Sequence, residues 1–285
     1  MKNPMPRLVH VQDSTSNRTA VDILKKFPPL HEVEFCFIPG NPVSASDILQ
    51  TIKGRAVLIW DDGNSHLLSK FLDIPGATKR IIDNHDDYDS GHGFSDITYA
   101  NHAFFSELSG CDIQLALTTW CRDYVNFLSR LPAAKSKNTT KIKELTVPLD
   151  APFNGAPLHL SVDLDAVLFF PAVSRWMTFD GFSGEDILSA LRMAVSTGQL
   201  ERLDFGGLAP GFPLLLADGF NGHIPDIRSP PDFGKTNPDD ARKIARWSEN
   251  ASTMENNPHR LGDISTKVSH YALYLYYQIL AISMF

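Results

Sequence analysis

RIIDNHDDYDSGHG, residues 80–93, places four aspartates and two histidines directly after two isoleucines that are typical of the end of a buried strand. Within it, Asp83, His85 and Asp87 occupy alternating positions, so an extended backbone leaving the strand would direct all three side chains to one side. Carboxylates this close together repel one another and take up protons unless a positive charge lies among them. The stretch therefore predicts a cation site at the end of a strand.

A second acidic pair follows another apolar run. Asp163 and Asp165, in SVDLDAV, have the same two-residue spacing. In open parallel sheets, ligand sites form beyond the carboxyl ends of the strands, where these two segments would meet. Either motif alone is also typical of a solvated acidic turn, but the combination favours metal binding. Oxygen ligands with a minority of imidazole suit manganese better than a thiolate-bound zinc, and two ions could share bridging carboxylates.

Composition limits the class of protein. The chain has 285 residues, 43% of them hydrophobic, and we expect one α/β domain over residues 1–285. The net charge of -7 provides no basic face for nucleic acid. Three cysteines without CxxC spacing, and an N-terminus without an apolar signal segment, indicate a cytoplasmic protein. The apolar run at 271–285 is too short to cross a bilayer, so we expect a core helix there and no membrane partner.

Apolar runs alternate with helical patterns along the chain. We expect strands at 7–12, 32–38, 55–60, 79–83, 111–117, 158–167 and 200–208, and helices at 45–53, 64–72 and 183–198. Several strands show no polar alternation, which predicts a mostly parallel sheet with helices on both faces. Ser183 is the expected N-cap of the last helix, with Gly198 near its end. The stretch 217–243, rich in Pro, Gly, Asn and Asp, predicts a long loop that could act as a substrate lid.

The motifs resemble those of the arginase-like ureohydrolases and occur in the same order. Asp83, His85 and Asp87 match the family's DxHxD motif. Asp163 and Asp165 match the later SxDxDxxDP motif, although its final Asp-Pro is missing from SVDLDAVLFF. The resemblance implies a three-layer α/β fold with a central, mostly parallel sheet flanked by helices.

A third motif is matched less closely. His66, in AVLIWDDGNSHLLSKF, corresponds to the histidine of the family's GGDHS segment, but the surrounding glycines differ. Downstream, residues 181–210 are similar to a helix and the following strand of the family, and residues 263–280 to its terminal helix. The similarity therefore extends in patches over roughly residues 55–280.

The resemblance also implies a binuclear manganese centre, with two Mn²⁺ ions per chain. The implied ligands are His66, Asp83, His85, Asp87, Asp163 and Asp165. Asp83 and Asp163 would bridge the ions, which would lower the pKa of a shared water that attacks the planar carbon of a guanidinium. Urea and an amine would leave. His102, in TYANHAFF, is the candidate proton donor to that amine, with His92, in SGHG, as the alternative.

Two departures from the family pattern bear on the substrate. Gly207, in LDFGGLAP, stands where the family's LDxxExNP motif has the glutamate that pairs with the guanidinium. Asp89 stands where arginases have an asparagine that contacts the carboxylate of free arginine, and a carboxylate there would repel it. The carboxylate that replaces the glutamate stays open among Asp89, Asp180, Glu201, Asp204 and Asp218.

These departures make the chain similar to the divergent peptide arginases, which convert arginine residues of a precursor peptide to ornithine. We therefore expect an arginine-containing peptide or a small guanidino compound as substrate. Two other functions stay open: a metal-dependent hydrolase of an amide or amidine, which Gly207 permits, and a binding protein that keeps the fold without catalysis. Homo-oligomerisation is also left open by the sequence.

Overall fold

The computed structural model of the protein describes residues 7–11, 15–33, 35–38, 56–60, 72–86, 88, 102–131, 139–155, 157–167, 181–206, 224–231 and 263–284. The strands are β1 (Arg7–Val11), β2 (Phe35–Ile38), β3 (Ala56–Trp60), β4 (Thr78–Asp83), β5 (Asp112–Leu117), β6 (Leu158–Asp163) and β7 (Leu200–Gly206). The helices are α1 (Thr15–Leu24), α4 (His102–Leu108), α5 (Thr119–Leu128), α6 (Thr139–Leu145), α7 (Gly184–Ser196) and α10 (Asp263–Met284). Two short 3₁₀ turns, η1 (Leu30–Glu32) and η4 (Leu164–Ala166), complete the described elements.

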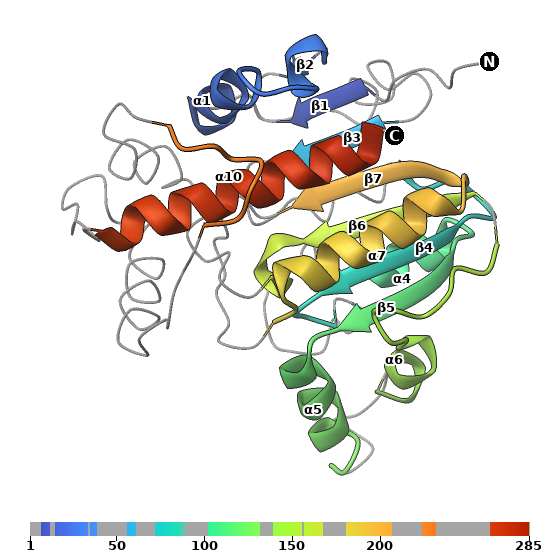
Figure 1. Ribbon diagram of the computed structural model, residues 1–285. Coiled ribbons are helices and arrows are strands. Elements are labelled where there is room, and N and C mark those ends of the chain that lie inside the picture. The colour runs from blue at the N-terminus through green and yellow to red at the C-terminus, as the bar shows by residue number, and fades with distance from the viewer. Residues whose placement is uncertain are drawn as a thin grey trace.

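The strands form a seven-stranded sheet in the order β2-β1-β3-β7-β6-β4-β5 (Figure 1). Every described pair of neighbouring strands is parallel. The register aligns the carboxyl ends of the central strands, since Asp83 of β4 lies opposite Leu117 of β5 and Asp163 of β6 lies opposite Gly206 of β7. The two acidic motifs therefore begin at the same edge of the sheet, as the sequence predicts.

Helices and apolar side chains cover both faces of the sheet. Ile82 of β4 belongs to a hydrophobic cluster with α1, α7 and α10, whereas its neighbour Ile81 belongs to a second cluster with α4, α5 and α6. Successive side chains of a strand point to opposite faces, so β4 is buried on both sides. Figure 1 shows α7 and α10 on the near side of the sheet and α4 on the far side. This double cover makes three layers, and it explains strands that are apolar on both sides.

The central strands β6 and β7 are polar on one face. The leucines and valine of β6 pack in the α7–α10 cluster, whereas His159, Ser161 and Asp163 alternate with them and lie on the opposite, α4-facing side. Asp204 of β7 lies opposite Ser161 in the register and shares that face. All four polar residues are buried. The α4-facing side is thus apolar at Ile81 of β4 and along β5, but polar at Lys79 of β4 and at the strands that lead to Asp163.

The seven expected strands are present, but some of them have different ends. β6 ends at Asp163 instead of continuing to residue 167, because the Asp163 carboxylate accepts the N–H of Asp165 at 3.0 Å and turns the chain into η4. β2 begins only at Phe35, since η1 occupies residues 30–32. β7 extends to Gly206, and the two residues expected beyond it lie outside the described part of the chain. The helices expected at 45–53 and 64–72 also lie outside it, apart from residue 72.

Helix α7 begins and ends as the sequence predicts. The Ser183 hydroxyl accepts the N–H of Asp186 at 3.1 Å, and the Asp186 carboxylate accepts the N–H of Ser183 at 3.1 Å. This reciprocal capping box satisfies backbone donors that have no partner within the helix. At the other end Gly198 has a φ of 68°, which a residue without Cβ adopts at little cost. The N-cap role of Ser183 is therefore confirmed.

Helix α10 is the core helix expected at the C-terminal end. Its side chains from Ala272 to Tyr277 are buried, and the Tyr274 hydroxyl donates to Glu185 of α7 at 2.8 Å. In the described part of the 217–243 stretch, Ile227 joins the same cluster and Gln278 of α10 donates to the carbonyl of Arg228 at 3.1 Å. The lid role of this stretch stays a prediction. Among the described helices, none is long and apolar enough to span a membrane.

The crossing of α7 and α10 generates a prediction about stability. A Cβ added to Gly184 would lie 2.6 Å from Leu275 Cδ2 and still closer to the Tyr271 hydroxyl. We expect Gly184→Ala to lower the free energy of unfolding by about 1 to 3 kcal/mol, because the methyl group forces the helices apart. Denaturant unfolding measures the change, with Ser189→Ala on the exposed side of α7 as the matched control. An equal stability of the two variants would contradict the close packing.

Candidate metal centre

Three side chains converge at the carboxyl edge of the sheet. Asp83, His85 and Asp165 each offer a ligand atom, and these atoms lie within 4.8 Å of one another. The Nδ1 atom of His85 is 3.1 Å from Asp165 Oδ2 and 3.6 Å from Asp83 Oδ1. Both carboxylates are buried, whereas 47% of the His85 side chain is exposed. The cluster therefore joins two distant segments of the chain and opens to solvent on the imidazole side.

Both motifs reach this geometry through the same local turn. After β4, the N–H of His85 donates to Asp83 Oδ1 at 2.7 Å, and after β6 the N–H of Asp165 donates to Asp163 Oδ1 at 3.0 Å. In each motif the first aspartate bends the chain so that the second ligand returns toward the strand end. The extended backbone expected from Asp83 onward is thus replaced by a bend at residues 84–85. The side chains of Asp83 and His85 still meet, but a turn brings them together and strand alternation does not.

Asn84 fixes this bend against the start of α5. Its side-chain carbonyl accepts a hydrogen bond from the Thr118 hydroxyl at 2.6 Å. Thr118 is the N-cap of α5, and the same hydroxyl accepts the N–H of Cys121 at 3.4 Å. The turn that presents His85 is therefore anchored to the helix that follows the neighbouring strand.

The electrostatics of the cluster follow from its burial. Burial lowers the pKa of His85, but hydrogen bonds and charge from Asp165 and Asp83 outweigh it and raise the pKa from 6.5 to about 12. In the protein alone, an imidazolium therefore supplies the positive charge that these two carboxylates need. A metal ion would bind the neutral imidazole and take over that role, releasing the proton.

The donor set fits a hard or borderline divalent cation. Two carboxylates and one imidazole, gathered around one point and free of thiolates, are ligands that suit manganese and similar ions. Asp163 joins this set through the backbone of Asp165, which its carboxylate holds in place. Asp83, His85 and Asp165 are thus the described residues whose ligand atoms converge, and the role of Asp163 as a ligand stays a prediction. The identity and number of the ions stay predictions.

The other predicted site residues either lie away from this cluster or lie outside the described residues. His66, Asp87, Asp89, His92 and Gly207 lie outside the described residues, so their roles stay predictions. His102 is described: it begins α4, is fully buried, and lies in a separate polar network beneath the cluster. Its role as proton donor also stays a prediction.

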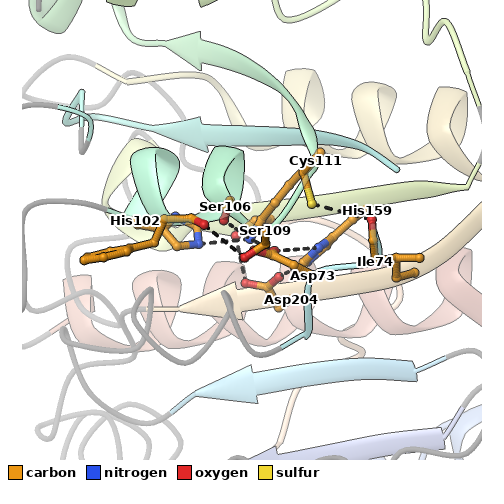
Figure 2. A network of polar contacts seen from close by, with 11 residues as sticks. Asp73, Ile74, His102, Ser106, Ser109, Cys111, His159 and Asp204 are labelled. Carbon is orange, nitrogen blue, oxygen red and sulfur yellow. Dashed lines mark hydrogen bonds and ion pairs between the residues drawn. The ribbon is translucent and has the colours of Figure 1, made fainter. Parts of the chain in front are cut away.

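That buried network lies between α4 and the sheet (Figure 2). The Lys79 ammonium of β4 contacts three groups: Asp73 Oδ1 at 2.6 Å, Ser106 Oγ at 3.0 Å and His102 Nε2 at 3.1 Å. Beside it, His159 Nε2 is 2.6 Å from Asp204 Oδ2. These contacts link β4, α4, β6 and β7 below the candidate metal centre.

Asp204 is the anchor of the network on β7. Its carboxylate accepts a hydrogen bond from Ser161 at 2.8 Å in addition to its contact with His159. Burial acts to raise the pKa of Asp204, but His159, Lys79 and Ser161 together lower it. Asp204 was one of the carboxylates considered for binding a guanidinium. Because these buried neighbours already engage both of its oxygens, the structure favours an internal role.

Most of this network is not predicted by the sequence. Lysine is seldom fully buried, so Lys79 at the start of KRIID gave no reason to expect an internal cation. A usable signal was nevertheless present at 158–163, where LHLSVD alternates strictly between apolar and polar residues. That alternation indicates a strand with one polar face, which is the face that carries His159, Ser161 and Asp163.

Comparisons with known proteins support the fold. No protein-family model matches the sequence, and no curated protein matches it. Among solved structures, formimidoylglutamase from Bacillus subtilis subsp. subtilis str. 168 is similar with a TM-score of 0.53 and 10% identity, covering 100% of this chain and 90% of that chain. Proclavaminate amidino hydrolase from Streptomyces clavuligerus has a TM-score of 0.46 and 12% identity, covering 97% of this chain and 94% of that chain.

At such identities, structural similarity establishes the fold alone. The match to formimidoylglutamase spans the whole chain, and the parallel sheet with helices on both faces agrees with it. The three-layer arginase-like α/β fold expected from the sequence is therefore confirmed. The single-domain organisation over residues 1–285 stays a prediction.

The cluster generates a prediction about metal binding. We expect Asp83→Asn to weaken manganese binding by at least about tenfold. Loss of a residue that only supports a metal ligand typically lowers metal affinity by about tenfold or more, and loss of a ligand itself should lower it at least as much. Titration with Mn²⁺, followed by metal analysis of the desalted protein, measures the effect. Asp112→Asn, an exposed change at the start of β5, is the matched control. Equal manganese content in both variants would show that Asp83 is not a ligand.

Proposed function

We propose that the protein is a metal-dependent hydrolase that cleaves a C–N bond of a guanidino group. The observation that carries this proposal is the convergence of Asp83, His85 and Asp165 at the carboxyl edge of a parallel sheet with an arginase-like fold. This edge is where open α/β sheets bind ligands. The acids are buried and close enough to require a cation, and the exposed side of His85 leaves the cluster open to a substrate.

Two Mn²⁺ ions per chain would be held by Asp83, His85, Asp163 and Asp165, together with His66 and Asp87. Bound cations supply positive charge and Lewis acidity, which make water a better nucleophile at neutral pH. The protein contributes the buried carboxylates that hold these charges and the turns that orient them. Addition of water across the guanidino carbon and loss of the amine yields urea, and the amine takes up a proton as it leaves.

We further propose peptidyl arginine as the substrate, converted to peptidyl ornithine. One sequence feature supports this choice. Asp89 would repel the carboxylate of free arginine, which an arginine residue inside a peptide does not carry. An amide or amidine is the second candidate substrate class, since Gly207 removes the side chain that would select a guanidinium.

Urea release from the manganese-loaded protein tests the proposal. We expect an arginine-containing peptide to lose the elements of cyanamide, seen by mass spectrometry, with an equal amount of urea formed. Free arginine should react more slowly, because Asp89 disfavours its carboxylate. The Asp83→Asn, Asp163→Asn double variant should lose the activity, and Asp112→Asn should keep it.

Other outcomes decide against the proposal. Faster turnover of free arginine than of the peptide would contradict the peptide substrate while retaining guanidino hydrolysis. Release of ammonia from amidine or amide compounds, without urea from any guanidino compound, would favour the second substrate class. A protein that binds no manganese, even after refolding in excess of the ion, would instead indicate a binding protein that keeps the fold.

A further inference from the structure

Three acceptors among the described residues surround the Lys79 ammonium. A protonated amine has three N–H donors and no acceptor. The three groups around it, Asp73 Oδ1, Ser106 Oγ and His102 Nε2, lie at 2.6, 3.0 and 3.1 Å. Lys79 and His102 are fully buried, so water does not compete for these bonds. Each of these three partners can therefore accept one N–H of the ammonium.

This geometry determines which imidazole nitrogen carries a proton. An ammonium can only donate, so His102 Nε2 must offer its lone pair. The proton of a neutral imidazole then lies on Nδ1. To become an imidazolium, His102 would need a proton on Nε2 as well, which would break the bond from Lys79 and place two buried cations 3.1 Å apart.

Other ionisable groups lie around this contact. Asp73 forms a buried ion pair with Lys79 and lies 3.8 Å from His159 Nδ1. Burial and the charge of Lys79 lower the pKa of His159. Burial, with Asp73 second, raises the pKa of the Cys111 thiol to about 11, so that thiol adds no charge. Asp204 is held by His159 and Ser161.

We infer that Lys79 holds His102 as a neutral hydrogen-bond acceptor, and that His102 is a positioning residue for α4 and not the proton donor of the reaction. A general acid must carry the proton that it gives away, and donation from Nδ1 of a neutral ring would leave an imidazolate. The consequence for catalysis rests on the proposed function, whereas the protonation state does not. The proton for the leaving amine then comes from a group outside this network, and His92 is the remaining histidine candidate.

Nuclear magnetic resonance tests the protonation state without any assay of activity. Two-bond ¹H–¹⁵N correlations of the ¹⁵N-labelled full chain distinguish the two neutral tautomers from the imidazolium, and the spectrum of His102→Gln assigns the signal. We expect His102 to be the Nδ1–H tautomer and to keep it between about pH 5 and 8, where an ordinary histidine titrates. An Nε2–H tautomer, or an imidazolium within this range, would overturn the inference.

Two substitutions at residue 102 test the role in catalysis. Glutamine offers an oxygen to Lys79, whereas leucine fills the space without an acceptor. We expect His102→Gln to retain at least about ten times the kcat of His102→Leu, because a positioning role is rescued by an acceptor, whereas loss of a general acid would cost both variants a similar factor of roughly 10²- to 10⁴-fold. Equal losses in both folded variants would overturn the inference. If the unchanged protein hydrolyses no guanidino compound, the proposed function fails and the resonance experiment still decides the protonation state.

Discussion

Charge compensation on the α4-facing side of the sheet is the constraint on which the site depends. This face buries three carboxylates at its carboxyl edge, in Asp83, Asp163 and Asp165, and a further one below them in Asp204. Buried anions are tolerated only with cations or donors at hydrogen-bond distance. The lower part of the face is closed and contains its own cation, Lys79. At the edge, the half-exposed His85 imidazole contacts Asp83 and Asp165, and among the described residues this is where a cation could reach the buried carboxylates from solvent.

The closed lower part and the open edge follow from the different side chains on the two faces of the sheet. On the α7–α10 side, Ile82 of β4 and the apolar residues of β6 and β7 form one cluster with the C-terminal helix. On the α4–α6 side, the apolar cluster contains Ile81 of β4 and the apolar residues of β5, whereas Lys79 of β4 and the residues of β6 and β7 are polar. The polar residues of β6 and β7 thus lie between the sheet and α4, and the apolar α7–α10 cluster lies on the other side of the sheet. Parallel pairing aligns the ends of these strands, so the polar face leads directly to the acidic turns.

The sequence predicts the strands well, because apolar runs that are buried on both sides can be recognised from the local sequence alone. It predicts the convergence of the two acidic motifs for a related reason, since parallel strands end at one edge. Strand ends are predicted less well: β6 stops at Asp163 because a side chain captures the N–H of Asp165, a local contact that alternation does not indicate. The sequence does not predict the partners of Lys79 either, because they lie in α4 and in the turn before β4, and only tertiary packing brings them to Lys79.

The shared turn explains how one residue can serve both folding and binding. In each motif one oxygen of the first aspartate accepts the N–H two residues later, and the carboxylate also supplies the negative charge at the strand end. Asparagine has a carbonyl oxygen that can accept the same N–H, but it carries no charge. An Asp-to-Asn change at Asp83 or Asp163 therefore preserves the turn and removes the charge, whereas alanine would remove both. Loss of metal in an asparagine variant can for this reason be attributed to the lost charge, with the backbone of the site still held in place.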